Sequence, residues 1–407
     1  MGIISNLFSP QAAISDDDIR KMLMEAGVSG YGGYGTSSSG ATVSPHTAMC
    51  VSAVFACVQV ISQTVGQLPI VLYRRTPKGK ERAVNHPLFH LVGARPNKFN
   101  HSMAFREMLT AHTCLRGNGF AFINRVGGGR IYELLPLEAS AVGINRDPRT
   151  WEITYTVSQK DGINGIYGPK DIFHLMDMTL NGYSGVSRLT YARESVGLSM
   201  STEKFGAQLF KNGAKMGGIL KYGKFFKDAE TGRKVAESFD DRTNGENAHR
   251  TILLEDGLEW EKITMTSEDA QFLATRQFQI PEIARFYRMP LHKIQDMSAS
   301  TNNNIEQQAL EFLSDTMAPW LERWCQSMNT QLLTESEQKE YYFKFDIDDL
   351  LRPDMKSRYE AYASGIASRI LNPNECRDWE DLDPYPEGNV YANPAITPGQ
   401  GDNNGKK

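Results

Sequence analysis

The stretch Ile280-Pro-Glu-Ile-Ala-Arg-Phe-Tyr-Arg-Met-Pro290 stands near the end of a segment with the character of a long helix. The segment opens with Ser267-Glu-Asp269, where a serine hydroxyl can cap free N–H groups and the acids suit the helix dipole. We expect the helix to run to about Gln279, to break or kink at Pro281, and to stop at Met289-Pro290, because proline lacks the N–H that a helix interior needs.

The next segment, Met297-Ser-Ala-Ser-Thr-Asn-Asn-Asn304, has neither charge nor apolar periodicity and therefore predicts a polar loop. Beyond it, a stripe that repeats every three or four residues predicts a second helix: Ile305, Ala309, Phe312, Thr316, Trp320 and Trp324. Pro319 lies near the middle of this helix and should kink it. The sequence thus predicts two long helices joined by a polar loop.

Length and composition restrict the class of protein. The chain has 407 residues, more than one domain usually holds, and its 40% apolar and 23% charged residues are typical of globular proteins. A formal net charge of −4 argues against a simple nucleic-acid binder, which is usually basic. The five cysteines form no C-x-x-C pair, which favours free thiols in a reducing compartment. With no apolar run long enough for a membrane span and no targeting signal, we expect a soluble, cytosolic protein.

The N-terminal part predicts a flexible arm followed by a packed α+β region. Gly30 to Gly40 is rich in glycine, serine and tyrosine, so this stretch should hold no fixed fold alone. Packing should begin at Thr47, where apolar spacing and turn residues predict three helices and four strands. The helices are one through Val51 and Val65, one capped by Asn85 that begins at His86-Pro87, and one at 103–115; the strands are 68–74, 120–126, 130–135 and 151–157, with a hairpin turn at Gly127-Gly-Gly129.

A third long helix is expected from Arg188 to Asn212, closed by Gly213. Its apolar residues are few and small residues such as Gly197 and Gly206 interrupt them, so it cannot bury a full stripe in its own subunit. Neighbouring copies in a ring could supply the missing contacts; the alternative is an ordinary helix half covered by its own domain.

The remaining chain predicts smaller elements. Residues 217–266 should form an α/β insert with strands at 218–222, 251–254 and 258–265 and a helix at 228–239. A strand at 341–347 and a helix at 354–370 should precede an acidic segment and a Pro/Gly/Asn-rich tail.

Motifs along the chain resemble the portal protein family of tailed double-stranded DNA phages. The C-terminal half carries the stretch 280–290 quoted above, Asn304-Ile-Glu-Gln-Gln308 and Pro319-Trp-Leu321. The N-terminal half carries, in the family's order, His86-Pro-Leu88, Arg95-Pro-Asn97, Gly117-Asn-Gly119 and Glu133-Leu-Leu-Pro136. Each motif is weak alone, but their order over most of residues 47–380 makes the resemblance specific.

The resemblance implies an α+β, portal-like fold: a wing domain with a mixed sheet, long stem helices, a small α/β clip and a helical C-terminal crown. The implied parts are a flexible arm at 1–46, the wing at 47–187, stem helix 1 at 188–216, the clip at 217–266, stem helix 2 at 267–295, a tunnel loop at 296–304, a kinked helix and wing strand at 305–353, the crown at 354–390 and a disordered tail at 391–407. The tunnel-loop residues implied to face DNA are Met297, Ser298, Ala299, Ser300, Thr301, Asn302 and Asn303.

The resemblance also implies a function without catalysis. Members of the family form a ring, typically of twelve copies, at one capsid vertex, and double-stranded DNA passes through it during packaging and ejection. The ring nucleates head assembly with the major capsid protein or scaffold, docks the terminase large subunit and later carries the head–tail adaptor. The implied location is the virion after assembly in the host cytoplasm, with no cofactor, metal or membrane contact.

Charge is patterned along the middle of the chain. Residues 188–227 contain eight lysines or arginines against two acids, and residues 255–269 contain six acids against one lysine. A uniformly basic channel would hold DNA tightly at low salt, because each neutralised phosphate releases counterions, whereas translocation needs weak contact that is independent of base sequence. The basic candidates for such contact are Lys204, Lys211, Lys215, Lys221 and Lys224; the alternative is a solvated helix face.

No motif in the chain indicates an active site. The chain lacks G-x-x-x-x-G-K-[ST] and is not itself a P-loop ATPase. His86 and His90 have helical ligand spacing but no further ligand motif, so we predict no metal site.

Two other functions stay open. One is a metal-dependent nuclease that uses Asp346, Asp348 and Asp349, although a strand end before a helix cap explains these acids as well. The other is a monomeric virion scaffold protein. Mg²⁺-dependent cleavage that is lost in Asp348→Ala would support the nuclease, and native mass separates a monomer from a ring.

Overall fold

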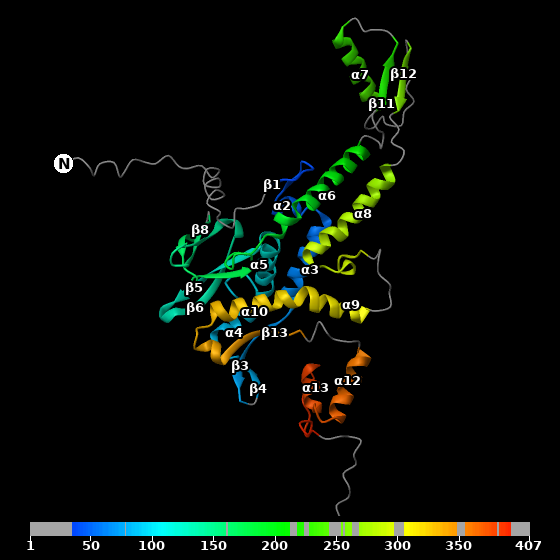
Figure 1. Cartoon of the computed structure of the whole chain (residues 1–407). Coiled ribbons are helices and arrows are strands. Elements are labelled where there is room, and N and C mark those ends of the chain that lie inside the picture. Colours follow the sequence, from blue (N-terminus) through cyan, green and yellow to red (C-terminus); the bar gives the residue numbers. More distant parts are fainter. Residues whose placement is uncertain are drawn as a thin grey trace, which may run out of the picture. The chain divides into compact units, whose positions relative to one another are not determined.

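The structure is a computed structural model that describes residues 35–77, 79–159, 162–211, 218–223, 228–243, 254, 257–262, 268–296, 305–347, 355–380 and 382–391 (Figure 1). The chain divides into two compact units. The larger unit comprises Met1–Asn302 and Glu311–Phe345, and the smaller one Asn303–Leu310 and Asp346–Lys407. In the described residues, helices and small sheets build the larger unit, and helices build the smaller one.

The core of the larger unit contains two packed helices, α3 (Ser52–Gln67) and α5 (Ser102–Arg116). The apolar positions predicted for the first helix are buried on α3: Val54, Val58, Ile61 and Val65. Cys57 and Cys114 are buried in the same core, where burial raises the pKa of Cys57 to about 12 and also raises that of Cys114. Both thiols therefore stay protonated, and all five cysteines are free.

The start of the next helix differs slightly from the prediction. α4 (Pro87–Gly93) begins at Pro87, one residue later than expected, and its cap is His86 rather than Asn85. The Nδ1 atom of the His86 ring accepts a hydrogen bond from the N–H of Leu88 at 3.2 Å. The imidazole nitrogen of His86 thus accepts the capping hydrogen bond that we expected the side-chain oxygen of Asn85 to accept.

Three three-stranded sheets occur in the described residues, and every strand pairing in them is antiparallel. Their orders are β10 (Ile172–Met176), β5 (Asn118–Val126), β6 (Arg130–Leu137); β7 (Val142–Arg146), β8 (Ile153–Ser158), β9 (Asn164–Tyr167); and β13 (Tyr341–Phe345), β3 (Ile70–Thr76), β4 (Gly79–Arg82). The turn at Gly127–Gly129 joins β5 to β6 as predicted. The expected mixed sheet is wrong for these residues: short connections make β5–β6, β7–β8, β8–β9 and β3–β4 antiparallel, and the distant strands β10 and β13 also pair antiparallel with β5 and β3.

Two of the family motifs contact each other. Asn97 Nδ2 donates to the carbonyl of Leu134 at 2.8 Å, and the N–H of Leu134 donates to the carbonyl of Pro96 at 2.8 Å. Asn97 Oδ1 also accepts the N–H of Asn100 at 2.7 Å. The Arg95-Pro-Asn97 turn before α5 is therefore held on β6 by one backbone hydrogen bond and one from the Asn97 side chain.

The helix α8 (Glu268–Tyr287) runs without a break and contains Pro281 in its interior. Of the two outcomes expected at this proline, a break or a kink, the break does not occur, and the predicted end before Met289-Pro290 is right. One proline removes a single backbone hydrogen bond, and burial of Ile283 and Tyr287 holds the following turn on the core. Arg288 then ends the helix with a left-handed φ of 53°, and a single turn, η4 (Leu291–Ile294), follows.

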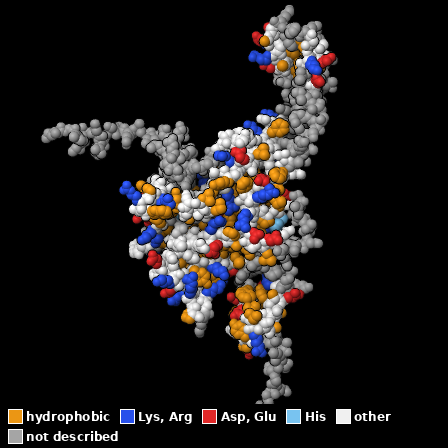
Figure 2. Space-filling model, viewed as in Figure 1, with side chains coloured by type: hydrophobic (Ala, Val, Ile, Leu, Met, Phe, Trp, Pro, Cys, Tyr) orange, Lys and Arg blue, Asp and Glu red, His pale blue; other side chains and the backbone are white. Residues whose placement is uncertain are grey.

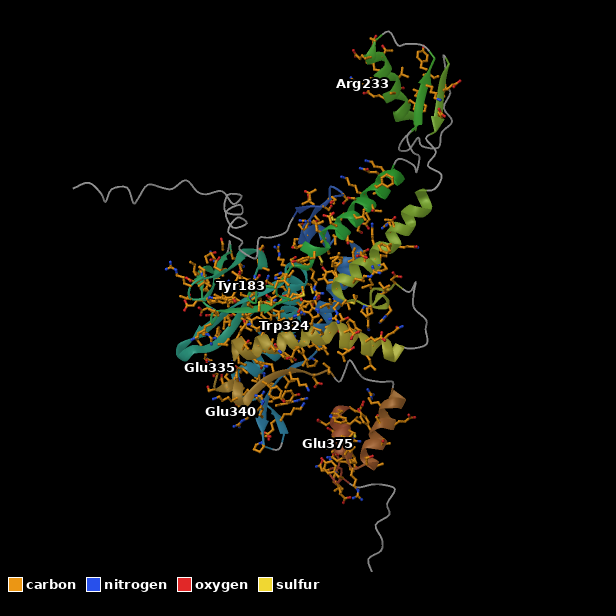
Figure 3. All side chains as sticks on the ribbon, viewed as in Figure 1. Tyr183, Arg233, Trp324, Glu335, Glu340 and Glu375 are labelled. Atoms are coloured by element: carbon orange, nitrogen blue, oxygen red, sulfur yellow. The ribbon has the colours of Figure 1, made fainter. Side chains whose placement is uncertain are left out.

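The next helix contains a π-helical segment near the position of the predicted kink. α9 (Ile305–Glu311) continues into η5 (Phe312–Met317) and then α10 (Ala318–Leu332). Pro319 has no N–H, and the residue before it bonds a carbonyl five positions back rather than four. The predicted stripe is buried at Phe312, Thr316, Trp320 and Trp324. Trp324 also donates its Nε1–H to Thr110 Oγ1 on α5 at 3.0 Å (Figure 3).

The predicted α/β insert is present. β11 (Gly218–Tyr222) pairs antiparallel with β12 (Leu258–Lys262), and α7 (Ala229–Thr243) lies between them in sequence. The strand expected at 251–254 falls outside the described residues except for Leu254, which is in no strand.

The smaller unit contains α12 (Met355–Ala367) and α13 (Pro373–Trp379), the second of which forms within the segment that we expected only to be acidic. A capping box between Asn372 and Glu375 starts α13. Hydrophobic side chains cover much of the visible face of this unit (Figure 2). Its exposed apolar residues include Tyr359, Ile370, Trp379, Leu382, Tyr385, Val390 and Tyr391.

Candidate nucleic-acid interface

The helices α6 (Arg188–Lys211) and α8 lie side by side (Figure 1). The start of α6 contacts the end of α8, so the two helices run antiparallel. Their polar contacts are Arg188 Nη1 to the Phe286 carbonyl (3.0 Å), Gln279 Nε2 to Thr202 Oγ1 (3.3 Å) and Arg276 Nη2 to Glu203 Oε1 (3.2 Å). The two helices that the family resemblance implied to be the stem pair are therefore in contact within one subunit.

A hairpin from the predicted arm covers one side of α6. β1 (Gly35–Thr36) pairs with β2 (Thr42–Val43), and Ser38 in the turn between them donates its N–H to Glu194 at 2.9 Å. At Gly197 any side chain would overlap the hairpin, so glycine permits this close approach. The glycine-rich stretch, which we expected to hold no fixed fold alone, forms its hairpin on the helix.

Two exposed lines of side chains run along α6. Tyr191, Leu198 and Phe205 are 62%, 46% and 50% exposed, and their seven-residue spacing places them on one line. Lys204 and Lys211, two of the basic candidates, are also exposed and seven residues apart. Because each residue turns a helix by about 100°, the lysine line lies about 100° around the helix from the apolar line.

The predicted basic and acidic segments meet in the α/β insert. Lys221 on β11 forms an ion pair with Glu261 on β12, so charges that are separate in the sequence partly neutralise each other. On α7, Arg233 pairs with Glu237 at 3.5 Å (Figure 3). Arg188, which belongs to the basic segment in the sequence, is largely buried and does not contribute to an exposed basic surface.

The other predicted site residues lie outside the described residues: Met297, Ser298, Ala299, Ser300, Thr301, Asn302, Asn303, Lys215, Lys224, Asp348 and Asp349. Asp346 is half-buried just after β13. His86 pairs with Glu337 at 3.3 Å. Within the part of the chain that the structure describes, no three His, Cys, Asp or Glu side chains gather as a metal site. No helix among the described residues is long and apolar enough to cross a membrane.

A buried ion cluster lies at the start of α6. Asp177, whose side chain is 1% exposed, accepts hydrogen bonds from Arg188 Nε at 2.5 Å and Nη2 at 3.0 Å. Arg323 on α10 lies 3.3 Å from the same carboxylate. Burial alone would lower the pKa of Arg188, but the hydrogen bonds and charge of Asp177 raise it above its ordinary value. One carboxylate thus connects the first turn of α6 to α10.

The family motif Gly117-Asn-Gly119 holds the loop that leads into α6. Gly117 has a left-handed φ of 80°, and its carbonyl accepts the N–H of Asp177 at 2.8 Å. Asn118 Oδ1 accepts the N–H of Gly185 at 2.7 Å, and Asn118 Nδ2 donates to the carbonyl of Gly185 at 3.0 Å. A Cβ atom at Gly185 would overlap the carbonyl oxygen of Gly117. The motif therefore fixes where α6 begins.

His174 extends this network into the sheet. Its Nε2–H donates to Asn118 Oδ1 at 2.9 Å, and its Nδ1 accepts from the Tyr155 hydroxyl at 3.1 Å. Burial lowers the pKa of His174 to about 3. The ring is therefore neutral in the folded protein at all but strongly acidic pH.

We expect the free energy of unfolding to fall as the pH drops below about 6.5, the ordinary pKa of histidine. Below this pH the histidine of the unfolded chain binds a proton, whereas buried His174 in the folded protein stays neutral down to about pH 3. pH 5 lies about 1.5 units below this ordinary pKa, so the free energy of unfolding should be about 2 kcal/mol lower there than at neutral pH. Urea denaturation at pH 7 and pH 5 measures it. His174→Gln, which cannot be protonated, should lose about 2 kcal/mol less than wild type over this interval; equal losses would contradict the assignment.

Sequence reasoning did not single out Asp177, Arg323 or His174 as residues that position α6. Each stands alone in the sequence, and only the fold brings it to its partners, so no local signal could have revealed it. The line Tyr191, Leu198 and Phe205 could have been found from its spacing of seven residues.

Comparisons with known proteins agree with these features. The family model described as phage portal protein matches residues 52–381. The probable portal protein of Streptomyces phage phiC31 is 31% identical over 363 residues, covering 86% of this chain and 79% of that protein. The portal protein of Enterobacteria phage HK97 is 30% identical over 367 residues, covering 89% and 85%.

Solved structures have the same fold. A chain in the neck of an empty GTA particle, computed with C6 symmetry, aligns with a TM-score of 0.60 and 22% identity over 84% of this chain and 93% of that one. An HK97 family phage portal protein from Corynebacterium diphtheriae aligns with a TM-score of 0.57 and 16% identity over 75% and 95%. Because the family match and both curated relatives extend over most of its length, this chain belongs to the phage portal protein family.

Proposed function

We propose that this chain forms a homo-oligomeric ring of about twelve copies at one capsid vertex, and that double-stranded DNA passes through the ring during packaging and ejection. The observation that carries the proposal is the family match over residues 52–381 with relatives named portal proteins. Structural neighbours in GTA particle necks of C6 and C12 symmetry support a closed ring. Assembly would take place in the host cytoplasm.

The apolar line of Tyr191, Leu198 and Phe205 is our candidate for contact between neighbouring subunits in the stem. Exposed apolar side chains on one line of a long helix are costly in a monomer and are buried when a second helix packs on them. The hairpin β1–β2 and α8 already cover other sides of α6, which leaves this line for a neighbour.

The exposed line of Lys204 and Lys211 is our candidate for weak DNA contact, since it lies on a different side of α6 from the apolar line. Two lysines per subunit give phosphates an attractive but sparse surface, which suits movement better than tight binding. The tunnel loop at 296–304 would contact DNA through polar side chains. The proposal includes no catalytic residue and no cofactor.

The α/β insert at 217–266 is our candidate clip, the surface on which the terminase large subunit and later the head–tail adaptor would dock. Residues 354–390 would form the crown. The exposed apolar residues of the smaller unit support contacts of that unit with other chains, among which the major capsid protein or scaffold are candidates.

Leu198→Asp tests the ring contact. A carboxylate in a packed apolar contact, with the leucine side chain lost, should cost about 2 kcal/mol or more at each interface, so rings should give way to monomers. Size-exclusion chromatography with mass photometry measures the change. Gln208→Asp, also an exposed position on the same helix but off the line, serves as the control and should leave the rings intact. Rings of normal mass in Leu198→Asp would rule out this contact.

Deletion of Met297–Thr301 tests the tunnel loop. We expect ring formation to persist and DNA packaging or retention to fall, because the loop contributes to the channel and not to contacts between subunits. Mass photometry and a packaging assay with nuclease protection measure the two effects separately. Loss of the ring on this deletion would contradict the loop assignment.

A further inference from the structure

A hollow of about 280 Å³ lies where α6, α8 and α10 meet. Its lining combines aromatic surface with an unusual number of guanidinium groups: Tyr191, Arg188, Tyr287, Arg288, Trp320 and Arg323 contribute, together with Asp177 and Asp315. The hollow is within the larger unit and is formed by one copy of the chain.

The charge around the hollow is unbalanced. Three arginines face two aspartates, and one of the two, Asp177, is already shared by Arg188 and Arg323. Burial lowers the pKa of Arg323; the charge of Asp177 offsets part of this, and the positive charges of Arg188 and Arg288 act in the same direction as burial. A second carboxylate placed here would therefore be attracted by Arg323 and Arg288 in a partly desolvated site.

Aromatic surface completes the lining of the hollow. Arg188 Cζ and Arg323 Cζ each lie 5.2 Å from the centroid of the Trp320 ring, within the range of a cation–π contact. The ring of Tyr287, a buried residue that also lines the hollow, lies 5.6 Å from Arg188 Cζ.

We propose that the hollow accepts the carboxylate of an acidic side chain from a second copy of the chain, with Arg323 and Arg288 as its partners. The inference rests on the proposed ring. Tyr191 lines the hollow and is also the first residue of the apolar line, so the hollow is continuous with the candidate contact between subunits. In a ring, each contact joins two different surfaces, so a cationic hollow on one copy meets a different and complementary surface on the next.

Carbodiimide cross-linking tests the inference on assembled rings. Arg288 is exposed, so Arg288→Lys offers a primary amine to the neighbouring carboxylate. The reagent activates that carboxylate, the amine attacks it, an amide forms and the reagent leaves as its urea. The variant also carries Asp315→Asn, which removes from the hollow an acid of the same copy that could compete. Rings are assembled from equal amounts of ¹⁴N- and ¹⁵N-labelled chains, so that cross-linked peptides report whether their halves come from one copy or two.

We expect cross-linked peptides that join the lysine to an acid and carry mixed isotopes in about half of the molecules. Arg285→Lys is the matched control on the same helix, because Arg285 is exposed and pairs with Glu282 in its own turn. Its cross-links should carry one isotope only. Intact rings whose Arg288→Lys cross-links never carry mixed isotopes would overturn the inference and leave the ring proposal standing.

A second experiment distinguishes whether the hollow binds a protein carboxylate or a small free anion. If millimolar inorganic phosphate raises the melting temperature of wild-type rings but not of Arg288→Gln rings, and mixed-isotope cross-links are absent, the hollow binds a free anion and the inference is wrong. Failure of the wild-type chain to form rings at all would refute the proposed ring, and this inference would fall with it.

Discussion

Asparagine in place of Asp177 is expected to lower the free energy of unfolding by about 3–5 kcal/mol, the range for removing one partner of a buried ion pair. The Asp177 side chain is 1% exposed, and its partners Arg188 and Arg323 are 17% and 29% exposed. The amide keeps the shape of the side chain but cannot balance two guanidinium charges. The melting temperature should fall by about 5–10 °C.

Urea denaturation followed by tryptophan fluorescence measures this loss, because Trp320 lies against both arginines. Asp315→Asn is the matched control: it removes a carboxylate from the same hollow, but an exposed one, and should change stability by no more than about 0.5 kcal/mol. If both variants unfolded at the same urea concentration, the Asp177 cluster would not be a buried ion pair.

Gly185→Ala is expected to cost about 3 kcal/mol or more, since the added Cβ has no space. It would overlap the carbonyl oxygen of Gly117, which is backbone and cannot rotate away. Gly117 is itself fixed by its left-handed φ and by the hydrogen bond from Asp177. The loop before α6 must therefore move, and the contacts of Asn118 and Asp177 with it should be lost together.

Gly182→Ala in the same loop separates crowding from backbone strain. Gly182 has a φ of 83°, but nothing lies within 4 Å of the Cβ it would gain, so only the left-handed strain of about 1–2 kcal/mol applies. Thermal denaturation compares the two variants, and limited proteolysis reports whether residues 177–188 become accessible. Equal losses of stability would show that the close approach at Gly185 does not limit the fold.

The elements that the sequence predicted well are those with local signals. The α6 helix, the hairpin turn at Gly127–Gly129 and the buried stripe of α10 follow from spacing, glycine and aromatic residues that lie close together in the chain. The helix does not break at Pro281, one of the two outcomes expected there, because tertiary burial of the following turn outweighs one lost hydrogen bond. Rules based on neighbouring residues include the effect of the proline but not the burial of the following turn in the core.

The candidate site could be predicted only in part, because its important contacts join distant residues. Glycine and asparagine at 117 and 118 were visible as a motif, but their partner Gly185 was not. The charge pattern was visible as two runs, but strand pairing brings Lys221 to Glu261 and burial removes Arg188 from the surface. Charge in sequence therefore overstated the basic surface that α6 and β11 present.

Under our proposal, the apolar line on α6 connects the fold of one copy to assembly of the ring. A helix covered by the hairpin on one side and by α8 on another keeps Tyr191, Leu198 and Phe205 exposed. Side chains of this size, spaced seven residues apart and about half exposed, are what a contact with a neighbouring copy would bury under our proposal.

Electron microscopy of the purified wild-type protein tests the ring most directly. Top views classified by rotational symmetry should show closed rings with a central hole and about a dozen copies. A uniform population of monomers, both alone and after co-expression with the major capsid protein, would contradict the proposed function.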